Sequence, residues 1–281
     1  MTTERAHGTS SVEADRWDEK YHRDDPPPWE ISGPQSVLVE LAAAGLLSGR
    51  VLDLGCGTGE HSILAAEHGA QVLGVDISPQ AVKRAAEKAR GREVQARFEV
   101  ADALRLDLLG EVFDVVIDSG MFHSFDADKR SLYASSLANV VRIGGVVYVT
   151  CISDRQEGDW GPRRVSEAEI RDTFATGWTI EELKECWRER RADLESPAKA
   201  WLASIRRVAL DQSEPRAGRD RLDRERAEIR RLRLENELLE TEVIRGRLEL
   251  GRQTGLTGDE LAPLFRRLLK GLGAHDQSGP G

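Results

Sequence analysis

The sequence predicts an α/β fold with a doubly wound parallel sheet, followed by an α-helical C-terminal extension. Between residues 50 and 151, short aliphatic runs alternate with longer helical patterns, which is typical of a parallel sheet covered on both faces. A glycine-rich turn directly follows the first of these runs. The length of 281 residues leaves room for one large domain and an appendage.

The first 49 residues are expected to form an N-terminal helical cap segment, with a turn-rich block at 24–34 and a helix at 35–47. The main domain is then expected to span 50–210. Pro79 stands in the first turn of one predicted helix, where proline is favoured. The expected strands are 50–54, 71–76, 96–102, 113–118 and 145–151, and the expected helices are 60–68, 79–90 and 132–141.

The pattern loosens beyond residue 151. The stretch SEAEI (166–170) is typical of a capping box and predicts a short helix. Residues 178–185 and 201–208 read as two further strands, which as a hairpin would close one edge of the sheet, although both stretches also tolerate helix.

Composition limits the class of protein. The net charge of −9 argues against general nucleic-acid affinity. The three cysteines are far apart and in no metal-ligand spacing, so no metal site is expected. No stretch is apolar enough for a membrane span, and the N-terminus lacks the apolar core of a secretory signal. We therefore expect a cytoplasmic protein without nucleic-acid or membrane partners.

The segment VLDLGCGTGEH places Gly55, Gly57 and Gly59 between a strand and a helix. Glycines there allow a tight turn and a close approach of the backbone to a ligand. Asp76 ends the second strand, where a carboxylate can accept hydrogen bonds from both ribose hydroxyls of an adenosine. Asp102 ends the third strand, where it could accept from the adenine amino group.

Two ligands fit this geometry. A dinucleotide is usually bound by G-x-G-x-x-G. Here the spacing is G-x-G-x-G, preceded by Asp53, and Glu60 occupies the sixth position. A negative Glu60 would repel a pyrophosphate and would suit a ligand with a cationic amino acid tail.

The blocks VLDLGCGTG, GVDISPQAV and VADA, in this order and at these distances, resemble the class I S-adenosylmethionine-dependent methyltransferases. The resemblance covers roughly residues 17–208. It implies a Rossmann-like seven-stranded sheet with the last strand antiparallel, and S-adenosyl-L-methionine as cofactor. The cofactor-binding residues that it implies are Trp29, Asp53, Gly55, Gly57, Gly59, Asp76, Ile77, Asp102, Ala103 and Asp118.

The fourth predicted strand runs into reactive groups, VVIDSGMFHSF. Ligands in such folds lie beyond the carboxyl ends of the strands, and the cofactor takes the first three ends. Asp118 and Ser119 should therefore face the transferable methyl group. Asp118 and His123 are the catalytic candidates, since histidine has the pKa of a general base and Asp118 could be a base or orient the cofactor. Alternatively, Asp118 hydrogen-bonds the turn, and His123 caps the next helix or faces solvent.

The stretch 117–134 further resembles the thiopurine and thiol/halide methyltransferase branch, although the active-site loops differ. The matching residues are Asp118, Gly120, Phe122, Asp128, Arg130 and Tyr133. PPPWEISGPQ and DWGPRRVSEAEI resemble segments of small actinobacterial methyltransferases, which implies aromatic side chains over the cofactor and a loop over the acceptor; Trp29 packing onto the core is the alternative. The expected substrate-binding residues are Trp17, Tyr21, Ser119, Phe122, His123 and Trp160.

The tail is the predicted helical extension, 211–281. It carries 14 Lys/Arg and 14 Asp/Glu, so the whole net charge of −9 belongs to the first 210 residues. Residues 219–250 are coiled-coil-like, with heptad a positions at Leu222, Ile229, Asn236, Val243 and Leu250. This pattern favours a homodimer over a helix that packs on its own domain. A short amphipathic helix is expected at 258–272.

The sequence thus predicts an S-adenosylmethionine-dependent methyltransferase that acts on a heteroatom, a thiol sulfur or a phenolic oxygen, of a small molecule such as a natural product or xenobiotic. One rival is a protein or RNA methyltransferase, which the acidic domain and the absence of an Asn-Pro-Pro-Tyr-type motif disfavour. Another is a catalytically inactive cofactor-binding interaction protein.

Overall fold

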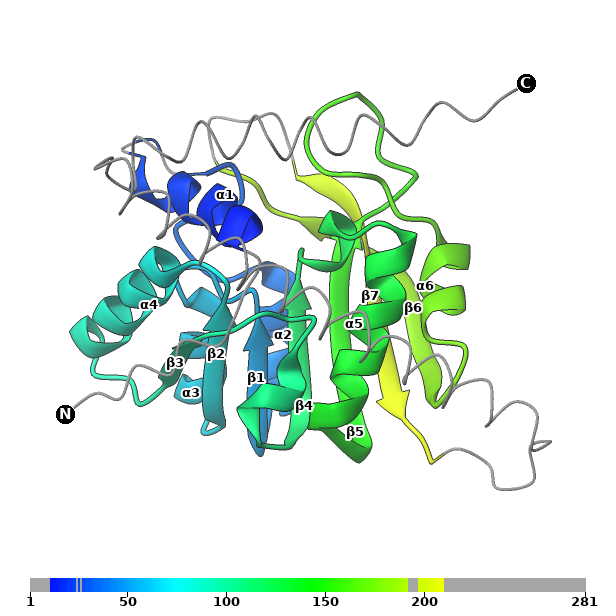
Figure 1. Cartoon of the computed structure of the whole chain (residues 1–281), viewed down its shortest axis with the longest axis horizontal. Coiled ribbons are helices and arrows are strands. Elements are labelled where there is room, and N and C mark those ends of the chain that lie inside the picture. Colours follow the sequence, from blue (N-terminus) through cyan, green and yellow to red (C-terminus); the bar gives the residue numbers. More distant parts are fainter. Residues whose placement is uncertain (1–10, 24, 26, 192–196, 210–281) are drawn as a thin grey trace, which may run out of the picture. The chain divides into compact units, whose positions relative to one another are not determined.

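The computed structural model describes residues 11–23, 25, 27–191 and 197–209. They form one seven-stranded sheet of order β3-β2-β1-β4-β5-β7-β6 (Figure 1). Strands β1 to β5 are parallel, and β7 is antiparallel to both β5 and β6, which confirms the predicted sheet, its antiparallel last strand and the hairpin at its edge. The strands are β1 Arg50–Leu54, β2 Gln71–Asp76, β3 Arg97–Val100, β4 Phe113–Ser119, β5 Val141–Ile152, β6 Trp178–Arg188 and β7 Ala198–Arg207.

Local sequence explains where several helices begin. Ser78 caps α4 by accepting from the amide of Ala81, and Pro79 occupies the first turn. Ser166 and Glu169 form the predicted capping box of α6. The helices are α1 Ser11–His22, α2 Ser36–Ala43, α3 Glu60–Glu67, α4 Pro79–Gly91, α5 Ala127–Val140 and α6 Glu167–Thr173, with short 3-10 turns at Leu106–Leu109 and Phe122–Ser124.

Several boundaries differ from the sequence prediction, and three of them have a local explanation. Helix α5 begins at Ala127 instead of residue 132, because the Asp126 side chain caps the amide of Lys129. Strand β5 begins at Val141, ahead of the Gly144–Gly145 pair that the prediction treated as its start. Helix α2 ends at Ala43, because the chain turns through Gly45 at a φ of 72°.

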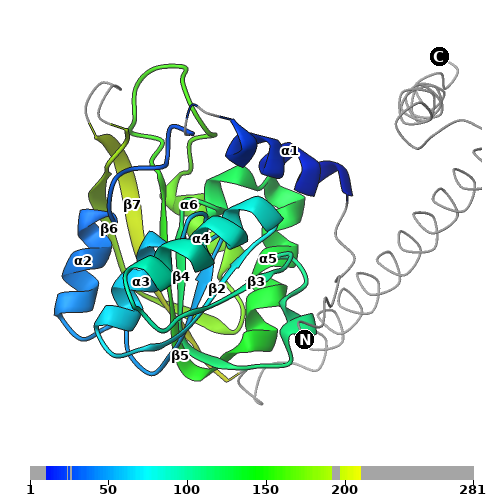
Figure 2. The same ribbon diagram turned by 90° about the vertical axis from the view of Figure 1, so that its left-hand side faces the viewer.

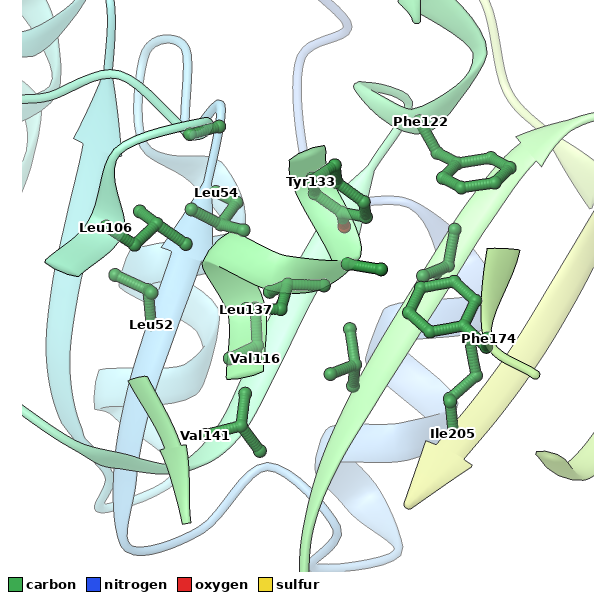
Figure 3. Packing of buried hydrophobic residues seen from close by; sticks show 14 of the residues in the cluster. Leu52, Leu54, Leu106, Val116, Phe122, Tyr133, Leu137, Val141, Phe174 and Ile205 are labelled. Carbon is green, nitrogen blue, oxygen red and sulfur yellow. The ribbon is translucent and has the colours of Figure 1, made fainter. Parts of the chain in front are cut away.

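Apolar side chains pack on both faces of the sheet. On one face, Leu137 and Tyr133 of α5 pack with Phe174, next to α6, against the sheet (Figure 3). On the other, Leu38 of α2 and Leu64 of α3 pack against β1, β2 and β4. The core therefore fixes the carboxyl ends of the strands in a rigid row.

Helix α1 lies at the carboxyl-end edge of the sheet in both views (Figures 1 and 2). The Asp18 carboxylate accepts hydrogen bonds from Ser78 Oγ at 2.6 Å and from the amide of Gln80 at 2.9 Å, at the start of α4. Glu13 and Lys129 form an ion pair at 2.8 Å, which ties α1 to α5. These contacts hold α1 over the strand ends, where the sequence places the ligand.

No helix among the described residues is both long and apolar enough to cross a membrane. The coiled-coil-like stretch 219–250, the helix predicted at 258–272 and the homodimer contact that they would provide lie outside the described residues. The domain limits at 49 and 210 remain predictions.

Candidate active site

The glycine loop joins β1 to α3 in a conformation that needs glycine. Gly55, Gly57 and Gly59 have φ angles of 63°, 53° and 87°, in the left-handed region. A Cβ on Gly57 would lie 3.0 Å from the hydroxyl of Tyr21. A Cβ on Gly59 would lie 2.9 Å from the Cβ of Ala85. The loop thus forms a tight cradle between α1 and α4.

The carboxylates at the ends of β2 and β3 shape the loops that follow them. Asp76 is buried and accepts from the amides of Gly57 and Ser78, both at 2.9 Å. Asp102 accepts from the amide of Leu104 at 2.8 Å. Ala103 is buried and Ile77 is half-buried beside these two aspartates. The residues predicted for the adenosine thus lie along neighbouring strand ends.

Asp53, in β1, is a buried acid with a spare acceptor. Its Oδ2 accepts from Ser62 Oγ at 2.6 Å, whereas its buried Oδ1 has no hydrogen-bond partner among the described residues. Burial raises the pKa of Asp53 to about 7, and the charges of Asp76 and Asp118 add to the effect. Asp53, Asp76 and Asp118 are buried at adjacent strand ends, where a bound cation would stabilise their ionised forms. The glycine cradle and the orphan Oδ1 therefore fit a ligand that carries a cationic amine.

Glu60 does not serve the ligand in the way the sequence suggested. Its two carboxylate oxygens pair with Lys88 and Arg92 of the α4 region, at 2.9 Å each. These partners lower the pKa of Glu60 against the opposing effect of its partial burial. Glu60 therefore offers no unpaired negative charge to a cationic amino acid tail, contrary to the sequence prediction, because Lys88 and Arg92 neutralise its carboxylate.

Asp118 is fully buried at the end of β4, and both of its oxygens are engaged. Oδ1 accepts from the amides of Met121 and Phe122, at 2.8 and 3.2 Å, and Oδ2 accepts from the Tyr133 hydroxyl at 2.7 Å. Burial raises the pKa of Asp118 to about 6 despite these donors. The contacts match the turn-bonding alternative and explain the pairing of Asp118 with Tyr133 in the resemblance.

His123 is buried in the 3-10 turn after β4. Its Nδ1 accepts a hydrogen bond from the amide of Ile152 at 3.2 Å, so the ring proton is on Nε2. Burial and nearby arginines lower the pKa of His123 to about 3. The ring is therefore neutral and has no free basic nitrogen in this arrangement. Its catalytic role stays a prediction, and these contacts weigh against it.

The three N-terminal aromatic residues gather over the glycine loop. The rings of Trp17 and Trp29 meet edge to face, with centroids 5.6 Å apart. Trp29 Nε1 donates to the Tyr21 hydroxyl at 3.2 Å. Lys20 lies over both indoles. These contacts fit both the aromatic cover over the cofactor and the alternative that Trp29 packs the N-terminal segment onto the buried Tyr21.

Two other residues predicted to bind the acceptor lie in different surroundings: Phe122 is in the core and Trp160 is in a loop. Phe122 is fully buried and packs against Tyr133 and Phe174 (Figure 3), so its side chain supports the site from behind. Trp160 lies in the loop after β5, between the guanidinium groups of Arg164 and Arg190, at 4.8 and 3.7 Å from the ring centroid.

Arg188, at the end of β6, is a site residue that the sequence reasoning missed. It is buried and donates to Ser119 Oγ at 2.9 Å, Thr150 Oγ1 at 3.1 Å and the Ser119 carbonyl at 2.9 Å. No motif marks this position, because the arginine comes from the far edge of the sheet. Only the β6–β7 hairpin, which pairs through β7 with β5, brings this residue to the end of β4.

The profile of a methyltransferase-domain family matches residues 51–145. A 2-heptyl-1-hydroxyquinolin-4(1H)-one methyltransferase of Mycobacteroides abscessus is 32% identical over 162 residues, which cover 56% of this chain and 70% of that protein. The chain belongs to the class I S-adenosylmethionine-dependent methyltransferases. Its cofactor is accordingly S-adenosylmethionine, a sulfonium compound with an amino acid tail.

Two other proteins are also similar to this methyltransferase. A solved structure described under the conversion of a disulfide bond into a thioacetal group during echinomycin biosynthesis is 36% identical. It covers 78% of this chain and 99% of its own, with a TM-score of 0.65. A probable thiol methyltransferase 2 of Arabidopsis thaliana is 31% identical over 140 residues, or 48% of this chain and 60% of that protein.

Proposed function

We propose that this methyltransferase transfers the methyl group to an oxygen or sulfur atom of a small molecule. The relatives support this choice, since one is named for a hydroxyquinolone and another for thiols. A natural product or a xenobiotic of this kind is the expected acceptor. The observation that carries the proposal is the cover over the strand ends, because it favours a small acceptor over a macromolecule.

The cover has two parts. Helix α1 is fastened to α4 and α5 by Asp18 and Glu13. The segment that follows is fastened to the end of β6, because Gln35 exchanges hydrogen bonds with the backbone of Glu189. A cavity of about 730 Å³ lies beside this junction, lined by residues 30–34 and 189–191 with Glu60 and Lys88. This volume is in the range of small-molecule sites, but the lining contains none of the residues that we assign to the cofactor or the acceptor.

The cofactor supplies an electrophilic methyl group on its sulfonium. We assign Asp53 Oδ1 and the glycine loop to its amino acid tail, since the orphan carboxylate oxygen suits an ammonium. Asp76 is assigned to the ribose, and Ile77, Asp102 and Ala103 to the adenine. Trp17, Tyr21 and Trp29 would cover this end, where indole faces suit a cation.

Asp118 and His123 are assigned to the acceptor end, together with Ser119 and Trp160. The bonds of Asp118 to two amides and to Tyr133 suit a residue that positions the turn. Positioning of the acceptor can supply much of the rate in a displacement of this kind.

A screen tests the proposal. The purified protein is incubated with S-adenosylmethionine and a panel of thiols, phenols and N-hydroxyquinolones, and S-adenosylhomocysteine is measured. We expect turnover with at least one class. Turnover confined to protein or RNA would favour the macromolecular rival, and cofactor binding without any turnover would favour the non-catalytic one.

A further inference from the structure

Arg188 is a buried cation at the acceptor end of the site. Its partners there are the hydroxyls of Ser119 and Thr150 and one backbone carbonyl, all uncharged. No carboxylate lies within ion-pair distance of Arg188 among the described residues. A buried cation without a counter-ion is costly, and proteins keep such groups mainly where a ligand provides the opposite charge.

The surroundings of Arg188 do not remove its charge. Asp118 is near, but its oxygens are directed to Met121, Phe122 and Tyr133. His123 is neutral, because burial and the neighbouring arginines hold its pKa far below the usual range. The charged or titratable groups that act on Arg188 electrostatically, or on which it acts, are His61, Asp118, His123, Cys151, Cys186 and Glu189.

Two further arginines act electrostatically on His123, as Arg188 does. Arg164 donates to the carbonyls of Gln156, Gly158 and Pro162, which carry no formal charge. Arg130 is paired with Glu169 at 2.9 Å, and its Nε and Nη2 are buried without partners among the described residues. Buried Arg188 and Arg130 thus lie on the acceptor half together with buried Asp118, whereas the cofactor half carries buried Asp53 and Asp76.

The position of Arg188 is fixed relative to the end of β4. A Cβ on Gly120 would lie 2.6 Å from Arg188 Nη2, so the guanidinium packs directly on the turn that follows Ser119. Three of its N–H groups are held by protein atoms. A guanidinium has five such donors, and the rest are available for a bound group.

We propose that Arg188 binds the methyl acceptor as an anion, so that the acceptor is an acidic hydroxyl or thiol ionised before transfer. This proposal rests on the proposed function and names its substrate class. The O–H or S–H bond breaks in solution or on binding, its electron pair stays on the acceptor atom, and the proton leaves to water. The enzyme then needs no general base, which agrees with the occupied nitrogen of His123.

The test measures the ionisation of a bound probe. The probe, 4-nitrophenol, is titrated with protein loaded with S-adenosylhomocysteine, and the absorbance of the phenolate reports its charge state without turnover. A nearby cation typically lowers the pKa of an acid by about one to three units. We therefore expect the wild type to bind the phenolate at least about tenfold more tightly than the neutral phenol.

Two variants identify the residue responsible. Arg188→Gln keeps hydrogen-bond donors but no charge and should lose the preference for the phenolate, whereas Arg188→Lys should keep part of it. Arg206→Gln is the matched control, because Arg206 is paired with Glu181 and donates to the Gly144 carbonyl at the opposite end of the β6–β7 hairpin. Calorimetry of S-adenosylmethionine binding checks that each variant is folded.

The proposal is overturned if Arg188→Gln binds the phenolate as well as the wild type does. It is also overturned if the wild type prefers the neutral phenol or binds neither 4-nitrophenolate nor 4-nitrothiophenolate. Product formation is not needed in this experiment. A failed acceptor screen would therefore count against the proposed function alone, and unchanged anion binding would count against Arg188 alone.

Discussion

The burial of Asp53, which suits a cationic ligand, lowers the stability of the ligand-free protein at neutral and higher pH. Its pKa is about 7 in the folded protein, against 3.8 for an unperturbed aspartate. The folded state therefore holds a proton that the unfolded state releases near pH 4. This contribution to stability is complete below pH 4 and is lost as the pH rises towards 7.

Asp53→Asn should therefore stabilise the cofactor-free protein at pH 8, by on the order of 2 kcal/mol, with the gain fading towards pH 4. The same change should weaken S-adenosylmethionine binding about tenfold, since the carboxylate would no longer face the cationic tail. Urea titrations at several pH values and calorimetry measure the two effects. Asp172→Asn, at an exposed position of α6, should change neither. Equal cofactor affinity in Asp53→Asn would remove Asp53 from the site.

A comparison of Gly57 with Gly45 distinguishes backbone strain from a clash with Tyr21 of α1. Gly57 and Gly45 both have positive φ, 53° and 72°, but only at Gly57 would a Cβ meet a neighbour, the Tyr21 hydroxyl. Both alanine variants should lose about 1 kcal/mol of stability from the backbone. Only Gly57→Ala should also displace Tyr21 and reduce cofactor affinity, at least about tenfold. Similar affinities for the two variants in calorimetry would show that the loop makes no close approach to the cofactor.

His123 offers a direct test of general-base catalysis. Asparagine can offer an amide oxygen near the position of Nδ1, so His123→Asn should keep the bond to the Ile152 amide. We expect kcat/KM to fall by less than about threefold and its pH profile to keep the same acidic limb. A general base is typically worth about a hundredfold or more. A loss of that size, with a shifted acidic limb, would establish His123 as the base.

The sequence predicted that the residues proposed for the cofactor lie close together, because local motifs carry them; their role in binding stays a prediction. Gly55, Gly57 and Asp76 come together through adjacent strand ends, as the order of the blocks implied. Arg188 could not be predicted, since its place beside Ser119 depends on the pairing of the last two strands. The ion pairs of Glu60 also could not be predicted from the sequence, because its partners Lys88 and Arg92 lie in and just after another helix.

At the scale of elements, α1 is a cover held by few contacts. Among the described residues, the Asp18 carboxylate accepts hydrogen bonds from the start of α4, where the helix dipole also favours a carboxylate. Asp18→Ala should remove about 1–2 kcal/mol of this local attachment. Residues of α1 should then become more sensitive to protease, and the cofactor should bind several-fold more weakly, while the melting temperature of the sheet changes little.

Asp15→Ala is the control for α1, because Asp15 is exposed on the same helix. Equal protease sensitivity of the Asp15 and Asp18 variants would show that the Asp18 contacts do not hold the cover.

The elements themselves were largely predictable, since the strands carry aliphatic runs and helix α4 has its own cap and proline. Their ends were less predictable, because Asp126 capped α5 five residues before the apolar pattern suggested.

At the scale of the whole molecule, charge is divided along the sheet. Buried Asp53 and Asp76 lie at the ends of β1 and β2, and buried Asp118 lies at the end of β4. Arg188 lies at the end of β6, and Arg130 lies in α5, where it is paired with Glu169. A cationic cofactor and an anionic acceptor would each meet the opposite charge, and their reaction would neutralise both. In a site of low dielectric, such prearranged charges act more strongly than in water.

All strands of the sheet lie within residues 50–207, so a protein truncated after residue 210 should fold and bind S-adenosylmethionine with unchanged affinity. If the coiled-coil-like stretch at 219–250 pairs two subunits, light scattering should give a dimer for the full chain and a monomer for the truncated one. Full-length variants with Ile229 and Val243 changed to Asp should also be monomers, because a charge at a heptad a position disrupts the seam. A full chain that is already monomeric would rule out pairing and leave the extension to pack on its own subunit.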